Sequence, residues 1–244
     1  MLRLLLFIVF AMGTMSWRAD AMCVDASGLV RSTVGITRQF DDASGSAHAG
    51  VVGISGTAWF LSPTVLVTAA HVATAMQLSD QYWSAVEITG PKGEQTADIR
   101  VLRLAGPQAE KIAVLELRIA YSDAHSLQIR VEPLTTEERV VSLAYPRNRL
   151  RFAEGRFVEN GASDKLAGMA LFELYDKDDR LVLDHGASGA PVLDCQGRVV
   201  AVVSNLFSQT MHFLSNTVRI PTAWGQANVA TVPIQALREP ALAK

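Results

Sequence analysis

Short stretches rich in β-branched and aromatic residues recur along the chain, and turn residues separate them. They occupy residues 32–40, 57–61, 65–68, 85–89, 98–104, 112–117, 140–144, 171–175 and 199–204. Apolar spacing typical of a helix is confined to two short pieces, residues 72–78 and 234–242. This pattern predicts an all-β protein, because sheets built from so many short strands close into barrels or sandwiches.

The composition supports a folded chain and excludes several functions. Of the 244 residues, 49% are hydrophobic and 19% are charged, which suits a full core and rules out disorder. The 22 Lys and Arg residues against 24 Asp and Glu residues give a net charge of −2 without a basic block, so a nucleic-acid partner is not expected. The strand pattern weakens over residues 119–128, which indicates a junction between two halves, residues 22–122 and 123–244. The small residues over 43–50 predict an exposed loop.

The first 21 residues have the pattern of a secretory signal peptide. A basic start at Arg3 precedes an apolar run over residues 4–12, and Ala19 and Ala21 provide the small residues of a cleavage site. About 10 apolar residues are too few to span a bilayer, so no membrane anchor is expected after signal removal. The chain is therefore predicted to be exported, to a periplasm or to the outside of the cell.

The cysteine and histidine content argues against a metal or redox centre. Cys23 and Cys195 are the only two cysteines, so a CxxC site is excluded. In an oxidising compartment they either form one disulfide or remain two separate thiols. The five histidines are scattered and none forms HExxH, so neither a metal nor a cofactor is expected.

The first chemistry-bearing motif is a strand that runs through small residues into a histidine. It covers residues 56–63 and 65–72, and Ala69 and Ala70 directly precede His71. Small side chains at this point let the backbone turn tightly and leave the imidazole facing a cleft. Taken alone, His71 is better explained as a core histidine bonded to backbone groups.

The second motif places a serine between glycines, within residues 184–193. Gly186 and Gly189 flank Ser188, and they permit backbone angles at which successive N–H groups converge on one point. A serine held there can attack a carbonyl while those N–H groups bind the developing oxyanion. Taken alone, Ser188 is better explained as a turn serine.

Both motifs in this order, 117 residues apart, resemble those of the chymotrypsin/trypsin-like serine proteases. The likeness is greatest to the compact bacterial exported proteases of the high-temperature-requirement type, without a PDZ module. It extends over most of residues 30–235, and includes the stretches 32–40, 112–115, 140–146 and 216–221. The resemblance implies one trypsin-like peptidase domain of two six-stranded antiparallel β-barrels, with the active site in the cleft between them.

The resemblance also assigns roles to residues. His71 resembles the general base, Ser188 the acyl-forming nucleophile, and the N–H groups of Gly186 and Ser188 the oxyanion hole. The implied function is an exported serine endopeptidase that hydrolyses protein or peptide substrates with water alone. The sequence leaves the oligomeric state open.

The third member of the triad departs from the family pattern. The family has an aspartate directly before the strand that begins at Ile112, and here that residue is Lys111. Glu110 is the favoured substitute, although neighbouring side chains on an extended strand point to opposite faces, so it requires a bulge. Asp98 is the second candidate, and the third possibility is that no carboxylate orients His71. The last case leads to the alternative function, a weakened or inactive homologue that acts as a binding or regulatory protein.

Further departures concern activation and specificity. Ala187 replaces the usual Asp or Asn, so pairing of a buried carboxylate with a freed N-terminus is not expected. The resemblance places the floor of the substrate pocket at Val182 and its wall after Ser204, which favours small or medium apolar side chains. His185 or His212 would instead favour an acidic residue.

The sequence fits a third function, that of an α/β-hydrolase esterase, poorly. Residues 186–190 approximate GxSxG, but Ala190 breaks the pattern and Pro191 opposes the helix that must follow.

Overall fold

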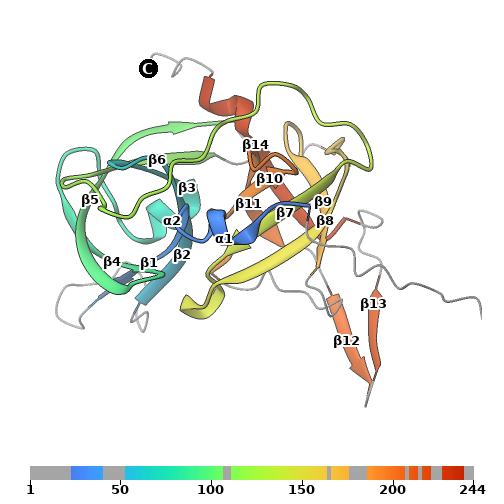
Figure 1. Ribbon diagram of the computed structural model, residues 1–244, viewed down its shortest axis with the longest axis horizontal. Coiled ribbons are helices and arrows are strands. Elements are labelled where there is room, and N and C mark those ends of the chain that lie inside the picture. The colour runs from blue at the N-terminus through green and yellow to red at the C-terminus, as the bar shows by residue number, and fades with distance from the viewer. Residues whose placement is uncertain are drawn as a thin grey trace, which may run out of the picture.

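The computed structural model describes residues 23–40, 53–106, 111–163, 166–175, 186–206, 209–213, 216–220 and 227–238. The predicted signal peptide and the predicted loop over residues 43–50 lie outside these ranges. The chain is almost entirely β-structure, arranged as two closed barrels side by side (Figure 1). No helix within the described ranges is long and apolar enough to cross a membrane.

The first barrel contains the six strands β1 to β6 in the order β1-β2-β3-β6-β5-β4, and every pairing is antiparallel. The strands are β1 (Thr33–Gln39), β2 (Gly53–Ser62), β3 (Val65–Ala69), β4 (Ser84–Gly90), β5 (Gly93–Ala105) and β6 (Ile112–Leu117). Side chains of alternate residues fill its interior because successive residues of a strand face opposite sides. Val34, Ile36, Phe60, Leu66 and Leu115 are all fully buried in this interior.

The second barrel has the strand order β10-β11-β14-β9-β8-β7 and is also antiparallel throughout. Its strands are β7 (Arg139–Ala144), β8 (Arg151–Asn160), β9 (Ala170–Tyr175), β10 (Pro191–Asp194), β11 (Val199–Leu206) and β14 (Val229–Pro233). The prediction of two six-stranded antiparallel barrels is confirmed. Strand β8 was not predicted, because charged residues occupy most of its exposed positions and only Ala153 and Phe157 are buried.

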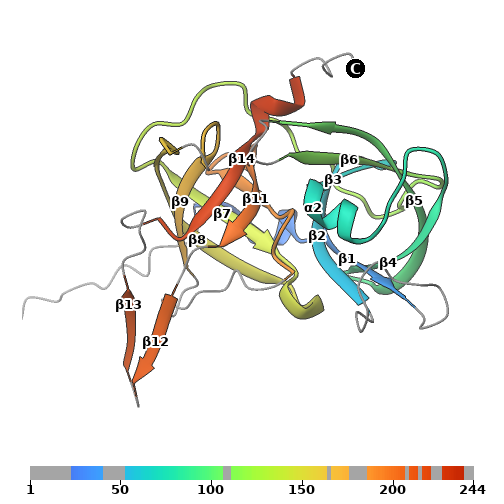
Figure 2. The ribbon, with the colours of Figure 1, turned by 180° about the vertical axis from the view of Figure 1, so that it is seen from behind.

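Two further strands form a hairpin outside the barrels. Among the described strands, β12 (Gln209–Phe213) pairs only with β13 (Asn216–Ile220), and the hairpin lies between β11 and β14 in the chain. It projects away from the second barrel, as the view from behind shows (Figure 2).

Helices are few and short: α1 (Ala26–Leu29), α2 (Ala70–Ala75) and the 3₁₀ turns η1 (Pro146–Asn148) and η2 (Ile234–Arg238). The helix predicted over residues 72–78 is thus shifted, beginning two residues earlier and ending before Gln77, whose φ of 52° is incompatible with a right-handed helix. The helix predicted from Ile234 is a 3₁₀ turn, and residues 239–242 lie outside the described ranges.

A single hydrophobic cluster joins the two barrels. Alternation along β2 sends Ala58 and Phe60 into the first barrel and Trp59 between the barrels. There Trp59 belongs to the same cluster as Leu143 and Val202 of the second barrel, and all three are fully buried. Fully buried aromatic and aliphatic side chains contribute roughly 1.5–3 kcal/mol each, so this cluster holds the facing edges of the barrels in a fixed relation.

Cys23 and Cys195 form a disulfide, with a Cα–Cα distance of 5.1 Å and a sequence separation of 172. Cys23 precedes α1, and Cys195 follows β10. The bridge therefore attaches the segment that leads into the first barrel to a turn of the second barrel. Val24 and Leu29 of that segment pack against the cluster between the barrels.

Replacing both cysteines by serine is expected to lower the free energy of unfolding by about 2–5 kcal/mol, because the unfolded chain then loses a constraint over a long loop. Urea denaturation of the double variant and of the oxidised wild type measures the difference. Adding a reductant should lower the midpoint of the wild type and leave that of the variant unchanged. Equal urea midpoints for the variant and the wild type in the absence of reductant would contradict the expectation.

Candidate active site

Thr57 of β2 connects the two barrels at the position of the serine motif. Its amide N–H donates to the Ser188 carbonyl (2.9 Å), and its hydroxyl donates to the Gly186 carbonyl (2.7 Å). The same hydroxyl accepts the Tyr145 N–H (2.9 Å), and the Thr57 carbonyl accepts the Thr68 hydroxyl (2.6 Å). One buried residue of the first barrel thus fixes the backbone on both sides of Ala187 in the second barrel.

The start of α2 lies against the residue that follows Ser188. A Cβ atom on Gly189 would stand 3.0 Å from the Ala69 amide nitrogen, 2.0 Å from the Thr57 carbonyl oxygen and 2.2 Å from the Thr68 hydroxyl. Only glycine fits here, and its φ of +92° also disfavours any other residue. His71 is exposed in the first turn of α2, two residues after Ala69. The two motifs, distant in sequence, therefore meet where the barrels touch.

The amides around Ser188 divide into bound and unbound groups. The Gly189 N–H donates to the Val203 carbonyl (2.8 Å) and the Ala190 N–H to the Ala187 carbonyl (3.0 Å). Within the described part of the chain, the N–H groups of Gly186 and Ser188 have no acceptor. Gly186 has a φ of +98°, in the left-handed region that glycine adopts without cost. These two amides are available to a ligand.

The Ser188 side chain is partly exposed, and its hydroxyl lies 3.2 Å from the Ser204 carbonyl of β11. This distance is longer than that of a strong hydroxyl hydrogen bond, so little holds the hydroxyl in this orientation. Ala187 is fully buried in the core of the second barrel, as is Ala190. Ala187 therefore contributes packing and no charge.

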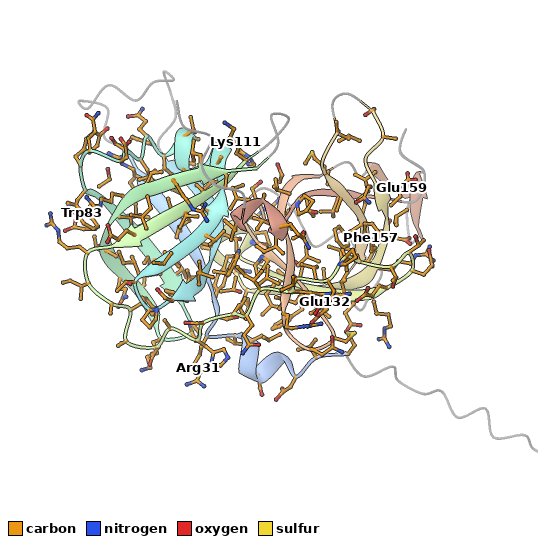
Figure 3. All side chains as sticks on the ribbon, turned by 90° about the horizontal axis from the view of Figure 1, so that it is seen from above. Arg31, Trp83, Lys111, Glu132, Phe157 and Glu159 are labelled. Carbon is orange, nitrogen blue, oxygen red and sulfur yellow. A yellow bond between two sulfur atoms is a disulfide. The ribbon has the colours of Figure 1, made fainter. Side chains whose placement is uncertain are left out.

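The segment before β6 lies beside the helix that carries His71. The Ala70 N–H donates to the Lys111 carbonyl (2.9 Å), and Ile112 pairs with Ala69. Lys111 is exposed, near the boundary of the barrels (Figure 3). Glu110, the favoured third member of the triad, lies outside the described residues.

Asp98, the second candidate, is far from this segment. It adjoins Ile99, which pairs with Leu117 at the opposite end of β6 from Ile112, about 17 Å away at the usual rise of a strand. Its carboxylate forms an ion pair with Arg118 (3.0 Å). Asp98 therefore serves the outer surface of the first barrel, and we do not assign it to the site.

The residues predicted for the substrate pocket are only partly described. Val182 and His185 lie outside the described ranges, and His212 falls within β12. Ser204 is buried, with 2% of its surface exposed, and its hydroxyl has no hydrogen-bond partner among the described residues. Its carbonyl, next to Ser188, is the group that borders the site.

Sequence reasoning missed Thr57 and Tyr145 as supports of the site. Thr57 lies inside the first motif, but its role depends on contacts across the barrels, which no local pattern reveals. Tyr145 is buried, and burial raises its pKa to about 12, with a smaller contribution from Tyr121. Its phenol is therefore neutral at physiological pH. No group of His, Cys, Asp and Glu residues suited to a metal ion occurs among the described residues.

Two antiparallel barrels that bring a glycine-flanked serine and a histidine-bearing helix together define the class of two-barrel serine hydrolases. The family model described as trypsin-like peptidase domain matches residues 56–202, which is more than half of the chain. The protein belongs to this family. No curated protein matches the chain.

Solved structures of low sequence identity share the fold. The Rv3671c protease from M. tuberculosis in its active form has a TM-score of 0.58 at 16% identity, with 87% of this chain and 80% of that chain covered. The HtrA-type protease AlgW with a tripeptide also gives 0.58, at 15% identity, with 87% and 61% covered. Deg5 gives 0.56 at 13% identity, with 87% and 88% covered.

Replacing Thr57 by valine is expected to destabilise the protein by about 1–3 kcal/mol, because a side chain of the same shape leaves the Gly186 carbonyl and the Tyr145 N–H without their partner. Chemical denaturation measures this loss. Thr64→Val, at an exposed position of the same barrel, is the matched control and should change stability little. Equal stabilities for the two variants would show that Thr57 does not hold the loop.

Proposed function

We propose that the protein is an exported serine endopeptidase in which Ser188 attacks the scissile carbonyl and His71 acts as general base. The observation that carries the proposal is the cross-barrel bonding of Thr57 to both Ser188 and Gly186, which supports a preformed loop next to α2. The weakly bound Ser188 hydroxyl rotates toward the imidazole, which takes its proton as the acyl-enzyme forms. The imidazole then protonates the leaving amine, and water hydrolyses the acyl-enzyme.

The unbound N–H groups of Gly186 and Ser188 would form the oxyanion hole. Donors already in place cost no reorganisation during the reaction, and the loss of one typically lowers the rate about 10² to 10³-fold. The Thr57 hydroxyl, by binding the Gly186 carbonyl, sets the orientation of this residue. Thr57 is thus proposed as a positioning residue.

We further propose Glu110 as the carboxylate that orients His71. It directly precedes Lys111, whose carbonyl accepts the Ala70 N–H, so the chain at this point passes beside α2. Asp98 offers no competing carboxylate, since it pairs with Arg118 at the other end of the barrel.

A fluorophosphonate probe tests the proposed nucleophile directly. The wild type should be labelled covalently, Ser188→Ala should not, and Ser122→Ala, at an exposed serine of the first barrel's outer loop, should be labelled like the wild type. Labelling that persists in Ser188→Ala would rule out this serine. Export is tested separately, by fractionating cells that produce the full chain and by sequencing the N-terminus of the mature protein.

The exposed Lys111 beside α2 favours one second candidate, a binding or regulatory protein that has lost its catalytic carboxylate. This candidate predicts a folded wild type that neither reacts with the probe nor cleaves peptides.

A further inference from the structure

Three exposed arginines occupy every second position along the turn between β7 and β8. Arg147 lies in η1, Arg149 follows it, and Arg151 begins β8. All three belong to a chain whose net charge is −2, so this local positive charge runs against the overall composition.

The turn borders the candidate oxyanion loop. A Cβ atom on Gly186 would lie 3.2 Å from the Tyr145 carbonyl oxygen and 3.4 Å from the Arg147 amide nitrogen. The Thr37 hydroxyl donates to the Asn148 side-chain oxygen (3.2 Å), which attaches η1 to the first barrel as well. Figure 1 shows η1 next to the boundary of the barrels, where it contacts β1 and β2.

The turn and β11 contact different residues of the candidate oxyanion loop. β11 approaches through the Ser204 carbonyl at the Ser188 hydroxyl, and the turn approaches through Gly186. A peptide whose carbonyl sits on the Gly186 and Ser188 amides would therefore lie close to the turn between β7 and β8, which contacts Gly186. An extended peptide advances about 3.3 Å per residue, so residues close to the scissile bond come within reach of the arginine side chains.

The backbone of the turn is strained at two consecutive residues. Arg147 has a φ of 53° and Asn148 a φ of 58°, and the left-handed region costs most residues roughly 1–2 kcal/mol. Asparagine adopts this region at a lower cost than arginine does, so the strain is greater at Arg147. Such strain persists where the surroundings fix it, and it is concentrated at functional sites.

Five arginines elsewhere in the described residues pair with carboxylates. They are Arg100, Arg118, Arg130, Arg156 and Arg198. Arg149 and Arg151, by contrast, form no ion pair with any residue in the described ranges. Their guanidinium groups are thus available to an anion that arrives from solution, and guanidinium binds carboxylate through two parallel hydrogen bonds.

We propose that Arg149 and Arg151, in the turn between β7 and β8, form a subsite for acidic side chains of the substrate, on the Gly186 side of the scissile bond. This inference rests on the proposed function, because it names the substrate class of the same site. Two exposed ion pairs should favour a substrate with Glu over the same substrate with Gln by roughly three- to tenfold. Salt between about 0.05 M and 0.5 M should reduce this preference, since it screens exposed charges.

The test uses fluorescence-quenched peptides in which one Glu or one Gln is moved through each position around the cleaved bond. The ratio of kcat/KM for the Glu and Gln peptides should exceed one at positions on one side of the bond in the wild type. It should fall toward one in Arg149→Gln/Arg151→Gln. The matched control, Arg31→Gln/Arg139→Gln, removes the same charge at exposed positions away from the turn and should keep the wild-type ratio.

Binding to Ser188→Ala separates this proposal from the proposed function. Fluorescein-labelled Glu and Gln peptides are titrated with Ser188→Ala in the wild-type, test and control backgrounds, and anisotropy gives the affinity ratio. If the wild type cleaves no peptide but this ratio still depends on Arg149 and Arg151, the proposed function fails and the subsite stands. If peptides are cleaved with equal rates for Glu and Gln, or if both double variants lose the preference equally, the subsite is overturned and the function stands.

Discussion

Ser188→Ala is expected to lower kcat/KM about 10⁶-fold, to the level supported by substrate binding and the oxyanion donors alone. The reason is that the Ser188 hydroxyl is the proposed nucleophile, and the amides of Gly186 and Ser188 are the proposed oxyanion donors. His71→Ala should lower kcat/KM by about the same factor. The double variant should lose hardly more activity than either single variant, because nucleophile and base act as a unit. Steady-state hydrolysis of a peptide substrate by the three variants measures this non-additivity.

Two controls make this result specific. Ser122→Ala should retain the wild-type kcat/KM, and circular dichroism should show that the inactive variants are folded. If the losses in Ser188→Ala and His71→Ala multiply in the double variant, the two residues do not act together. A folded wild type without turnover would instead favour the binding or regulatory function.

Glu110→Gln is expected to lower kcat/KM about 10⁴-fold, the cost of disrupting an orienting carboxylate in such a triad. Gln keeps the size of the side chain but does not stabilise the imidazolium that forms when His71 takes the serine proton. Lys111→Asp tests the neighbouring position, where the family has its aspartate, and should change the rate little if Glu110 already serves. The pH dependence of kcat/KM should shift in Glu110→Gln, a change that a purely structural role would not produce.

The opposite pattern would reassign the triad. If Glu110→Gln is neutral and Lys111→Asp raises kcat/KM, the natural protein lacks an orienting carboxylate and Lys111 is the cause. Asp98→Asn is the matched control for both variants, since Asp98 pairs with Arg118 far from α2. It should leave kcat/KM unchanged.

The catalytic hypothesis has a structural basis in the contacts of Thr57. In a preorganised site, donors for a developing charge are held in place before the reaction, and here a side chain of the other barrel holds the Gly186 carbonyl. The disulfide and the hydrophobic cluster around Trp59 also link the two barrels, the disulfide through the N-terminal segment. Stability and activity are therefore expected to respond together to changes between the barrels.

Local residue patterns were enough to predict the all-β class and the two motifs. Continuous apolar runs mark strands that are buried on both faces, as along β3 and β6, and alternation marks a strand with one buried face, as along β4. Glycines around Ser188 mark a turn whatever surrounds it. Strand β8 was not predicted because its exposed charges weaken the alternation of apolar residues. The predicted bounds of α2 were shifted because the end of this helix depends on the backbone conformation of Gln77.

The tertiary structure alone decided which of these residues meet. Closure of the barrels puts Asp98 and Ile112 at opposite ends of β6, sets Thr57 against Ser188, and brings Arg147 to Gly186. Cys23 and Cys195 pair for the same reason, at a sequence separation of 172. Local patterns depend on the conformational preferences of neighbouring residues, whereas these contacts depend on how two closed sheets pack, and that packing is a property of the whole chain.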